Sequence, residues 1–387
     1  MKILYLTYRF GGTIPTGVTA LRIADALFEL GHELCVISSP LCDKWQTGRH
    51  IICNNKPIYP AVVFTNVGNL IQRDLNYIFW EWRALHQIDR LLRSWKPDVI
   101  YARSSPSAVC NIAAEVSQRY CIPVLMHFTD PVPAPPEWHP NKRYRTREIK
   151  LMERILPIAN RISFGNQAML DYQHTLLKYD FTNKSFISPD PAPSKDFYYR
   201  EKKQDEEIVL TFLGSFHGNR KPENLFKAIE MVNDSGIKCK LRIYDDNHGI
   251  TPPAFIEYVG RTKDVVNAML DSDILVDVDA DDKIPVFVSS KIKDYLNCGR
   301  PVLSITPNNS PSRQLFSGMK TISLCSNNPN DISTTIIQLS KTYYYQKDYY
   351  ERKSVIEQFK ADVVAKEIIN QMVAMLCSKG NSDNVKC

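Results

Sequence analysis

The first half of the chain alternates between two hydrophobic patterns. Short apolar runs typical of buried strands occupy 2–8, 34–38, 97–101 and 123–127. Between them, Val18–Leu30 and Ala108–Tyr120 carry apolar residues at helical spacing. Alternating strands and helices predict a parallel, doubly wound α/β sheet.

The same alternation restarts in the second half. Strands are expected at 208–213, 238–244, 255–259, 274–278 and 301–305, with helices at 222–232, 262–270 and 290–297. Residues 189–205 hold three prolines and a run of charges, which is typical of a linker. We therefore expect two Rossmann-like domains that face a cleft, 1–190 and 207–350, joined by a linker at 191–206. Helices at 351–377 should pack back on the first domain, and 378–387 should form a disordered tail.

Composition places the chain among ordinary globular proteins. It has 387 residues, of which 44% are hydrophobic and 23% are charged, and no apolar run approaches the roughly 20 residues of a membrane span. The net charge of +6 is too mild to indicate nucleic acid, but it suits phosphate-bearing substrates or an anionic membrane surface. The first residues lack the apolar core of a signal peptide, and the ten scattered cysteines form no Cys-x-x-Cys pair. A cytoplasmic protein with reduced thiols is expected.

The most informative segment is 287–303. Ser289 and Ser290 can cap a helix start, where unpaired N–H groups favour anions, and Lys291 adds positive charge there. Asp294 follows one turn later. This spacing fits a nucleotide, with its diphosphate at the helix tip and its ribose hydroxyls at the carboxylate.

The same segment also contains residues that should end the predicted helix. Gly299 is expected to be the residue after the helix, and Pro301 prevents the helix from continuing. The simpler alternative is an ordinary helix-to-strand turn in which the serines only cap.

Several segments share their order and spacing with a known family. The chain resembles the group 1, family 4-like, retaining glycosyltransferases of the GT-B fold, especially enzymes of polysaccharide and lipopolysaccharide assembly. The matching segments are 2–6 with its glycine loop, 30–37, 130–131, 213–222, 258–261, 270–274 and 290–296. The resemblance implies transfer of a sugar, with retention, from a nucleotide sugar to a glycan or lipid-linked acceptor. It implies no metal or other cofactor.

The resemblance also implies a diphosphate site in the loop after the second domain's first strand. That loop carries Gly214, and Ser215 stands where the family usually has arginine. Arg220 matches the family's lysine, with Lys221 as its neighbour, and both would stabilise the leaving phosphate. The alternative is a solvated pair of basic residues that closes the loop.

Two glutamates of the family are only partly matched. Asp294 corresponds to the second glutamate, which binds the ribose, whereas the first falls at Val286. Either the first glutamate is lost or a nearby residue replaces it: Asp281, Asp282 or Lys283. Arg261 resembles the segment that lines the base, although a surface turn residue is an equal alternative.

In the first domain, the resemblance implies that Gly11, Gly12 and Gly17 face the donor phosphates, since glycine lets a backbone approach a ligand closely. His127 and Asp130 end the fourth strand. The resemblance places Asp130 near the reacting sugar, where it would orient sugar or acceptor. An Asx turn before a proline is the alternative for Asp130.

Two further patterns have competing interpretations. Asp277–Asp282 alternates carboxylates, which favours Mg²⁺ or Mn²⁺ chemistry, but Ala280 breaks the series, and we interpret these acids as bordering the donor site. The segment 77–93 is amphipathic, and 143–154 is basic. Both suit a peripheral contact with the inner face of a membrane, and a core-facing helix with a solvated face is equally possible.

Two rival functions stay open. A nucleotide-sugar 2-epimerase has the same two-domain architecture but uses acidic and histidine residues for proton transfer. A catalytically inactive assembly subunit is kept open by Ser215 and Val286. A dehydrogenase is disfavoured, because Gly11, Gly12 and Gly17 do not match the Gly-x-Gly-x-x-Gly spacing.

Overall fold

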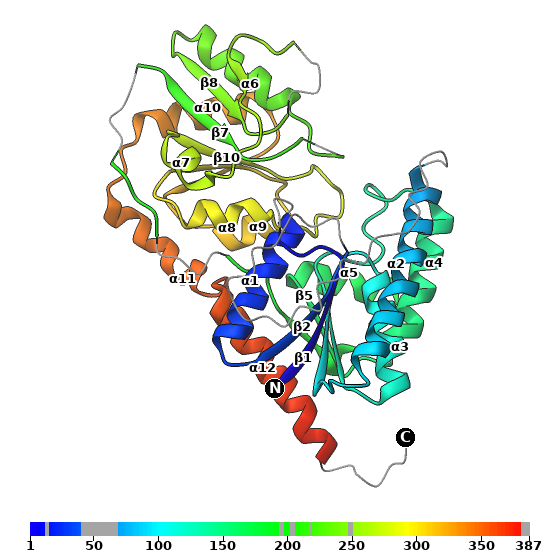
Figure 1. Cartoon of the computed structure of the whole chain (residues 1–387). Helices are drawn as coiled ribbons and strands as arrows, with labels where there is room; N and C mark the ends of the chain where they lie inside the picture. The colour runs from blue at the N-terminus through cyan, green and yellow to red at the C-terminus, as the bar shows by residue number, and fades with distance from the viewer. Residues whose placement is uncertain are drawn as a thin grey trace. The chain divides into compact units, whose positions relative to one another are not determined.

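A computed structural model describes residues 1–11, 15–39, 69–192, 197–201, 206–216, 218–246 and 251–380. Side chains are not described for 69–76 and 378–380. The chain forms two compact units (Figure 1): Met1–Pro191 with the segment from Lys360 onward, and Ala192–Phe359.

The first unit contains a six-stranded parallel sheet in the order β2-β1-β3-β4-β5-β6. Its strands are β1 (Lys2–Thr7), β2 (Glu33–Ile37), β3 (Val99–Ser104), β4 (Val124–Phe128), β5 (Arg161–Phe164) and β6 (Ser185–Ile187). Its helices are α1 (Pro15–Glu29), α2 (Asn69–Leu91), α3 (Ala108–Tyr120), α4 (Lys142–Ile155), α5 (Gln167–Leu176) and α12 (Ala361–Gly380). Strands β3 and β4 are buried at every position, which explains why each begins with a run of apolar residues.

The second unit repeats this design. Its parallel sheet has the order β12-β11-β10-β7-β8-β9, with β7 (Ile208–Phe212), β8 (Cys239–Ile243), β9 (Ile256–Tyr258), β10 (Ile274–Val278), β11 (Val302–Ile305) and β12 (Ile322–Cys325). Its helices are α6 (Glu223–Asp234), α7 (Val265–Leu270), α8 (Ser290–Leu296), α9 (Pro311–Phe316), α10 (Pro329–Lys341) and α11 (Lys353–Glu357). Two doubly wound parallel α/β domains confirm the predicted fold class.

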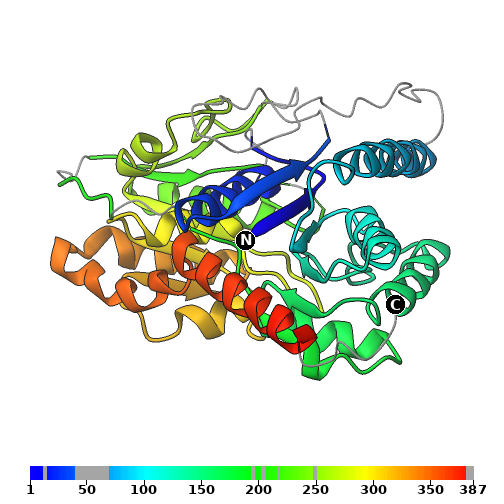
Figure 2. The ribbon, with the colours of Figure 1, turned by 60° about the horizontal axis from the view of Figure 1, so that its bottom comes forward.

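The end of the chain divides between the two units. The second unit extends to Phe359, beyond the expected boundary at 350, because the Ala192 N–H donates to the Phe359 carbonyl at 2.6 Å and so joins the two ends of this unit. The expected helical stretch 351–377 is therefore split into α11 and α12. Helix α12, red in Figure 2, packs its buried face, including Ile368 and Met372, on the core beneath α1. Residues 378–380 end α12, and 381–387 of the expected tail lie outside the described residues.

The predicted role of Gly299 is wrong. Helix α8 ends at Leu296 with Asn297 as its C-cap, and Gly299 is not among the described glycines with positive φ. A Cβ at position 299 would instead lie 2.4 Å from Cδ2 of Tyr199. Gly299 is required because aromatic rings pack against its Cα.

Candidate functional site

The loop after β7 and the helix α8 are fastened together. The Leu213 N–H donates to the hydroxyl of Tyr295, a fully buried residue of α8, at 3.0 Å. This bond places the start of the loop that carries Gly214 against α8, at the carboxyl edge of the second sheet. Ligands of doubly wound sheets bind at such edges.

Gly214 and Lys291 meet at this edge. Gly214 has a φ of +136°, and a Cβ on it would lie 2.3 Å from Cε of Lys291. Glycine is therefore needed at position 214 for two reasons: the backbone has a positive φ, and a Cβ would collide with the aliphatic part of the Lys291 side chain. The Lys291 ammonium lies 4.6 Å from the centre of the Phe212 ring, where cation–π attraction holds it.

The electrostatic surroundings of Lys291 are unusual for a lysine. Burial and the nearby charge of Arg220 lower its pKa from 10.5 to about 8, although Asp277, Asp279 and Asp245 act in the opposite direction. Two cations are thus close enough to repel each other in a poorly hydrated place. A bound anion would relieve both penalties. The structure brings together Gly214, Arg220 and Lys291, three of the predicted residues.

Two buried carboxylates interact electrostatically with Lys291 and Arg220. Asp277 lies within β10 and is fully buried, and neither of its oxygens accepts a hydrogen bond of full geometry from the described residues, although the Ser289 hydroxyl lies close enough to lower its pKa. Asp279 accepts hydrogen bonds from Thr306 at 2.8 Å and from Ser310 at 3.1 Å. Burial raises the pKa of both carboxyls, and in Asp277 the charge of Asp279 adds to the effect.

The position of Asp277 corrects the sequence interpretation. We expected a loop of carboxylates bordering the donor, whereas Asp277 lies in the strand itself and Asp279 is also buried. The available signal was an aspartate inside the apolar run of β10. The electrostatic effect of Asp277 and Asp279 on Lys291 was not predicted from the sequence.

The start of α8 also differs from the expectation. Ser289 occupies the N-cap position, but its side chain makes no capping hydrogen bond and is buried beside Asp277. Ser290 is the first residue of the seven-residue helix, and Asp294 lies half-buried one turn further on. Ser289 therefore does not cap the helix, and its side chain contacts Asp277 instead.

The remaining predicted residues of this unit have mixed positions. Ser215 is half-buried, and Lys221 is exposed with no ion pair among the described residues. Arg261 pairs with Asp245 at 3.5 Å and Asp246 at 3.2 Å. Since Asp245 also acts on Lys291, Arg261 belongs to the border of the same charged region.

In the first unit, Gly17 lies against the backbone of Gly11. The Gly11 N–H donates to the Gly17 carbonyl at 2.8 Å, and a Cβ on Gly17 would lie 2.2 Å from the Gly11 carbonyl oxygen. Gly12 lies outside the described residues. His127 is buried in β4, with Nδ1 at 3.0 Å from the Ser163 hydroxyl.

Asp130 is half-buried just after β4 and accepts a hydrogen bond from the Thr129 hydroxyl at 3.2 Å. The Thr129 hydroxyl also donates to the Ser104 carbonyl at 2.8 Å, which ties the ends of β3 and β4 together. Asp130 is thus placed at the carboxyl edge of the first sheet.

Sequence reasoning missed an ion pair in the first unit, between a buried arginine and a half-buried aspartate. The guanidinium of Arg103, at the end of β3, pairs with Asp190 and donates to the Thr19 hydroxyl at 2.7 Å and the Thr16 carbonyl at 3.2 Å. The pair therefore fixes the start of α1. A basic residue inside an apolar strand was the only available signal.

Comparison with known proteins agrees with this architecture. Residues 16–184 match the family model described as Glycosyltransferase Family 4. A comparison with curated protein sequences finds no match.

Solved structures match nearly the whole chain at low identity. Sucrose-phosphate synthase from Thermosynechococcus elongatus is 12% identical with a TM-score of 0.68, covering 98% of this chain and 99% of that one. A lipopolysaccharide outer core galactosyltransferase is 13% identical with a TM-score of 0.60, covering 97% and 99%. A putative UDP-N-acetylglucosamine 2-epimerase from Listeria monocytogenes is 10% identical with a TM-score of 0.57, covering 95% and 94%. The chain therefore has the GT-B fold, and its first unit is similar to Glycosyltransferase Family 4.

Proposed function

We propose that this protein is a glycosyltransferase that moves a sugar, with retention, from a nucleotide sugar to a glycan or lipid-linked acceptor. We place this reaction in the assembly of bacterial surface polysaccharide, on the cytoplasmic side of the membrane. The observation that carries the proposal is the pair of cations, Lys291 and Arg220, crowded at the carboxyl edge of the second sheet.

These residues suit the departure of a nucleoside diphosphate. When the bond between the sugar's anomeric carbon and the phosphate oxygen breaks, negative charge develops on that oxygen. Lys291 and Arg220 would stabilise this charge, which lowers the barrier. The anomeric carbon then bonds to the acceptor oxygen, and the acceptor's proton passes to the leaving phosphate. With two cations in this role, the proposal includes no metal.

Asp294 is proposed to bind the ribose, since it lies one turn beyond Ser290 on α8. Asp130 and His127 of the first unit are proposed on the sugar and acceptor side. This assignment makes the second unit the donor domain.

The first experiment asks whether the chain binds a nucleotide. Thermal denaturation is measured with UDP, GDP, CDP and ADP, and the matching nucleotide should stabilise the folded state by mass action. Asp294→Asn should reduce that stabilisation. Asp234→Asn, on the exposed end of α6, is the matched control. A panel in which no nucleotide stabilises the protein contradicts the proposal and favours an inactive subunit.

The second experiment separates the transferase from the epimerase. The purified protein is incubated with its nucleotide sugar and no acceptor, and the sugar is examined by NMR. Slow hydrolysis agrees with a transferase. Inversion at carbon 2 of the sugar contradicts the proposal.

A peripheral membrane contact is part of the proposal. No helix within the described ranges is long and apolar enough to cross a membrane. On α2, however, Ile78 and Trp82 are one turn apart and are 61% and 66% exposed. Helix α4 begins with exposed basic residues, including Lys142 and Arg143. An apolar face and a basic segment in one unit suit an anionic bilayer.

Sedimentation with vesicles tests this contact. Vesicles with anionic lipid should bind the protein, and Trp82→Ser should weaken that binding while leaving nucleotide binding intact. Equal binding by Trp82→Ser contradicts the membrane contact.

A further inference from the structure

The second unit has a pocket at the edge of its sheet opposite to the donor site. The pocket has a volume of about 90 Å³. Its floor includes Ile208 and Ile274, the first residues of β7 and β10, and Pro301, which precedes β11. Gly214 follows the other end of β7. The two sites are therefore separated by the length of the sheet.

Arg300 brings an uncompensated charge to this pocket. Its side chain is 5% exposed, and it donates from Nε and Nη2 to the Leu270 carbonyl at 3.2 and 2.6 Å, and from Nη1 to the Gly299 carbonyl at 2.9 Å. A guanidinium has five N–H groups, so two are left over. Within the part of the chain that the structure describes, Arg300 makes no ion pair.

A second buried guanidinium lies next to it. Arg352 is completely buried and donates from Nη2 to the Arg300 carbonyl at 2.9 Å. It too has only carbonyl and hydroxyl partners among the described residues, including the Cys298 carbonyl at 2.7 Å and the Thr321 hydroxyl at 2.9 Å. Two positive charges therefore share one region without a carboxylate bonded to either, and buried charges are costly unless paired.

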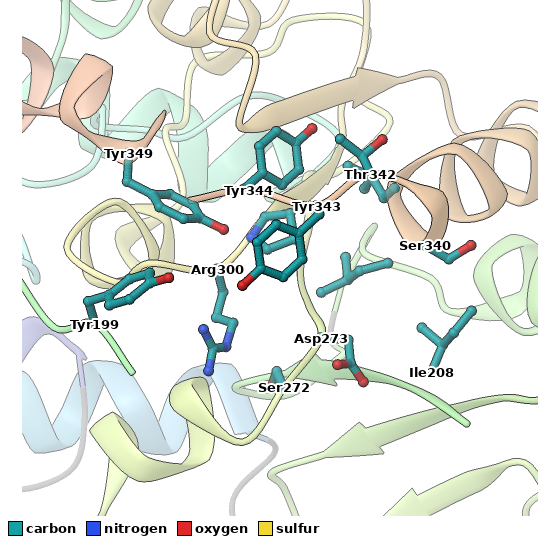
Figure 3. Close-up of a pocket in the computed structure, with 13 residues that line it drawn as sticks. Tyr199, Ile208, Ser272, Asp273, Arg300, Ser340, Thr342, Tyr343, Tyr344 and Tyr349 are labelled. Atoms are coloured by element: carbon teal, nitrogen blue, oxygen red, sulfur yellow. The ribbon is translucent and has the colours of Figure 1, made fainter. Parts of the chain in front are cut away.

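Tyrosines complete the lining. Figure 3 shows the hydroxyls of Tyr199, Tyr343 and Tyr349 turned toward the space beside Arg300. The Tyr343 hydroxyl also donates to Glu201 Oε1 at 3.2 Å. The hydroxyls of Tyr199 and Tyr349 make no hydrogen bond with the described residues. Tyrosine hydroxyls and the Arg300 side chain thus line the same pocket.

Asp273 is the acidic residue of the lining, and it is already engaged. Its Oδ2 accepts from the Val209 N–H at 2.8 Å, and it forms no ion pair with Arg300. This hydrogen bond ties the Asp273 carboxylate to the start of β7.

We propose that this pocket binds a small oxyanion, a carboxylate or phosphate group, between Arg300 and the hydroxyls of Tyr199 and Tyr349. Pockets that hold drug-sized ligands measure about 300–1,000 Å³, so a volume of about 90 Å³ suits a small anionic group and not a whole nucleotide sugar. Charge-assisted hydrogen bonds from arginine to such an anion are strong and geometrically specific. The anion is either free phosphate or the carboxylate of an acidic sugar.

The experiment uses the full chain and three probes: inorganic phosphate, glucuronate and glucose, at ionic strength matched with chloride. Affinity is measured by calorimetry in the Lys291→Met variant, so that the donor site does not contribute. Phosphate or glucuronate should bind saturably, and whichever binds identifies the source. Absence of binding by both anions in this variant, or equal binding of glucose, overturns the proposal.

Tyrosine variants locate the site without removing its arginine. Tyr199→Phe and Tyr349→Phe keep their packed rings, and each should weaken anion binding about tenfold through loss of one hydrogen bond to a charged group. Tyr350→Phe is the matched control, because this ring is 51% exposed and does not line the pocket. Unchanged affinity in both Tyr199→Phe and Tyr349→Phe overturns the proposal.

Discussion

The carboxyl edges of the two sheets have the same topology and opposite electrostatics. At the first edge, burial alone would lower the pKa of Arg103, but Asp190, Tyr5 and Tyr101 more than reverse this effect, and its pKa is raised. At the second edge, burial and Arg220 outweigh three acids, and the pKa of Lys291 is lowered to about 8. The folded protein stabilises the charged form of Arg103 and destabilises the charged form of Lys291.

This difference indicates what each edge is for. A buried cation with a raised pKa contributes to folding, because its charge is better stabilised in the native state than in water. A cation with a lowered pKa costs stability, and the cost is recovered when an anion binds. By this criterion Arg103 is structural, and Lys291 belongs to a binding site.

The largest expected effect is the loss of the structural pair. Arg103→Met removes the ion pair with Asp190 and the hydrogen bonds to Thr16 and Thr19 of α1, so the free energy of unfolding should fall by about 3 kcal/mol. Chemical denaturation measures this loss. Arg119→Met, which removes exposed ion pairs with Asp89 and Glu115, is the control and should change stability by less than about 1 kcal/mol. Equal losses in both variants would contradict the structural role of Arg103.

Lys291→Met should have the opposite profile. Its affinity for the stabilising nucleoside diphosphate should fall about 100-fold, since a charge-assisted contact with phosphate is worth up to about 3 kcal/mol. The free energy of unfolding should stay unchanged or rise, because a poorly compensated charge is removed. Lys227→Met, at an exposed position of α6, is the matched control. A large loss of stability with intact nucleotide affinity would contradict the assignment of Lys291 to a binding site.

The sequence predicted local features well and distant partners poorly. The apolar runs predicted most of the strands, although not β6 or β12, and helix α3 has the predicted bounds, because both patterns depend on neighbouring residues. Gly214, Arg220 and Lys291 were identified by motif spacing. Arg103 and Asp190 are 87 residues apart, so nothing in their local patterns revealed that they pair.

The same limit explains the errors at α8. Ser289 and Gly299 have residue types that suit helix ends, and local propensity predicted capping roles for them. In the structure, Ser289 lies beside Asp277, and Gly299 accommodates the ring of Tyr199. Tertiary contacts, which the sequence pattern does not contain, determine both positions.

Alanine at the two glycine loops sharpens the comparison. Gly17→Ala would press its Cβ against the Gly11 carbonyl oxygen at 2.2 Å, and Gly214→Ala would press against the Lys291 stem at 2.3 Å. Each should lower stability by about 1–2 kcal/mol. Gly214→Ala should also weaken nucleotide affinity about tenfold, because Lys291 is displaced. Calorimetry against the unsubstituted protein measures this loss, and unchanged nucleotide affinity in Gly214→Ala would argue against the contact between Gly214 and Lys291.

The smallest expected effect is a pH dependence that only the second edge should produce. Unfolded lysine binds its proton with a pKa near 10.5 and folded Lys291 with a pKa of about 8, so between these values the unfolded chain holds more protons and stability rises with pH. A bound diphosphate favours the charged ammonium, so binding near pH 9 should take up close to one proton, and affinity should fall up to about tenfold per pH unit above 8. Calorimetry in buffers of different ionisation enthalpy measures this uptake. It should vanish in Lys291→Met, and its persistence there would assign the proton to another group.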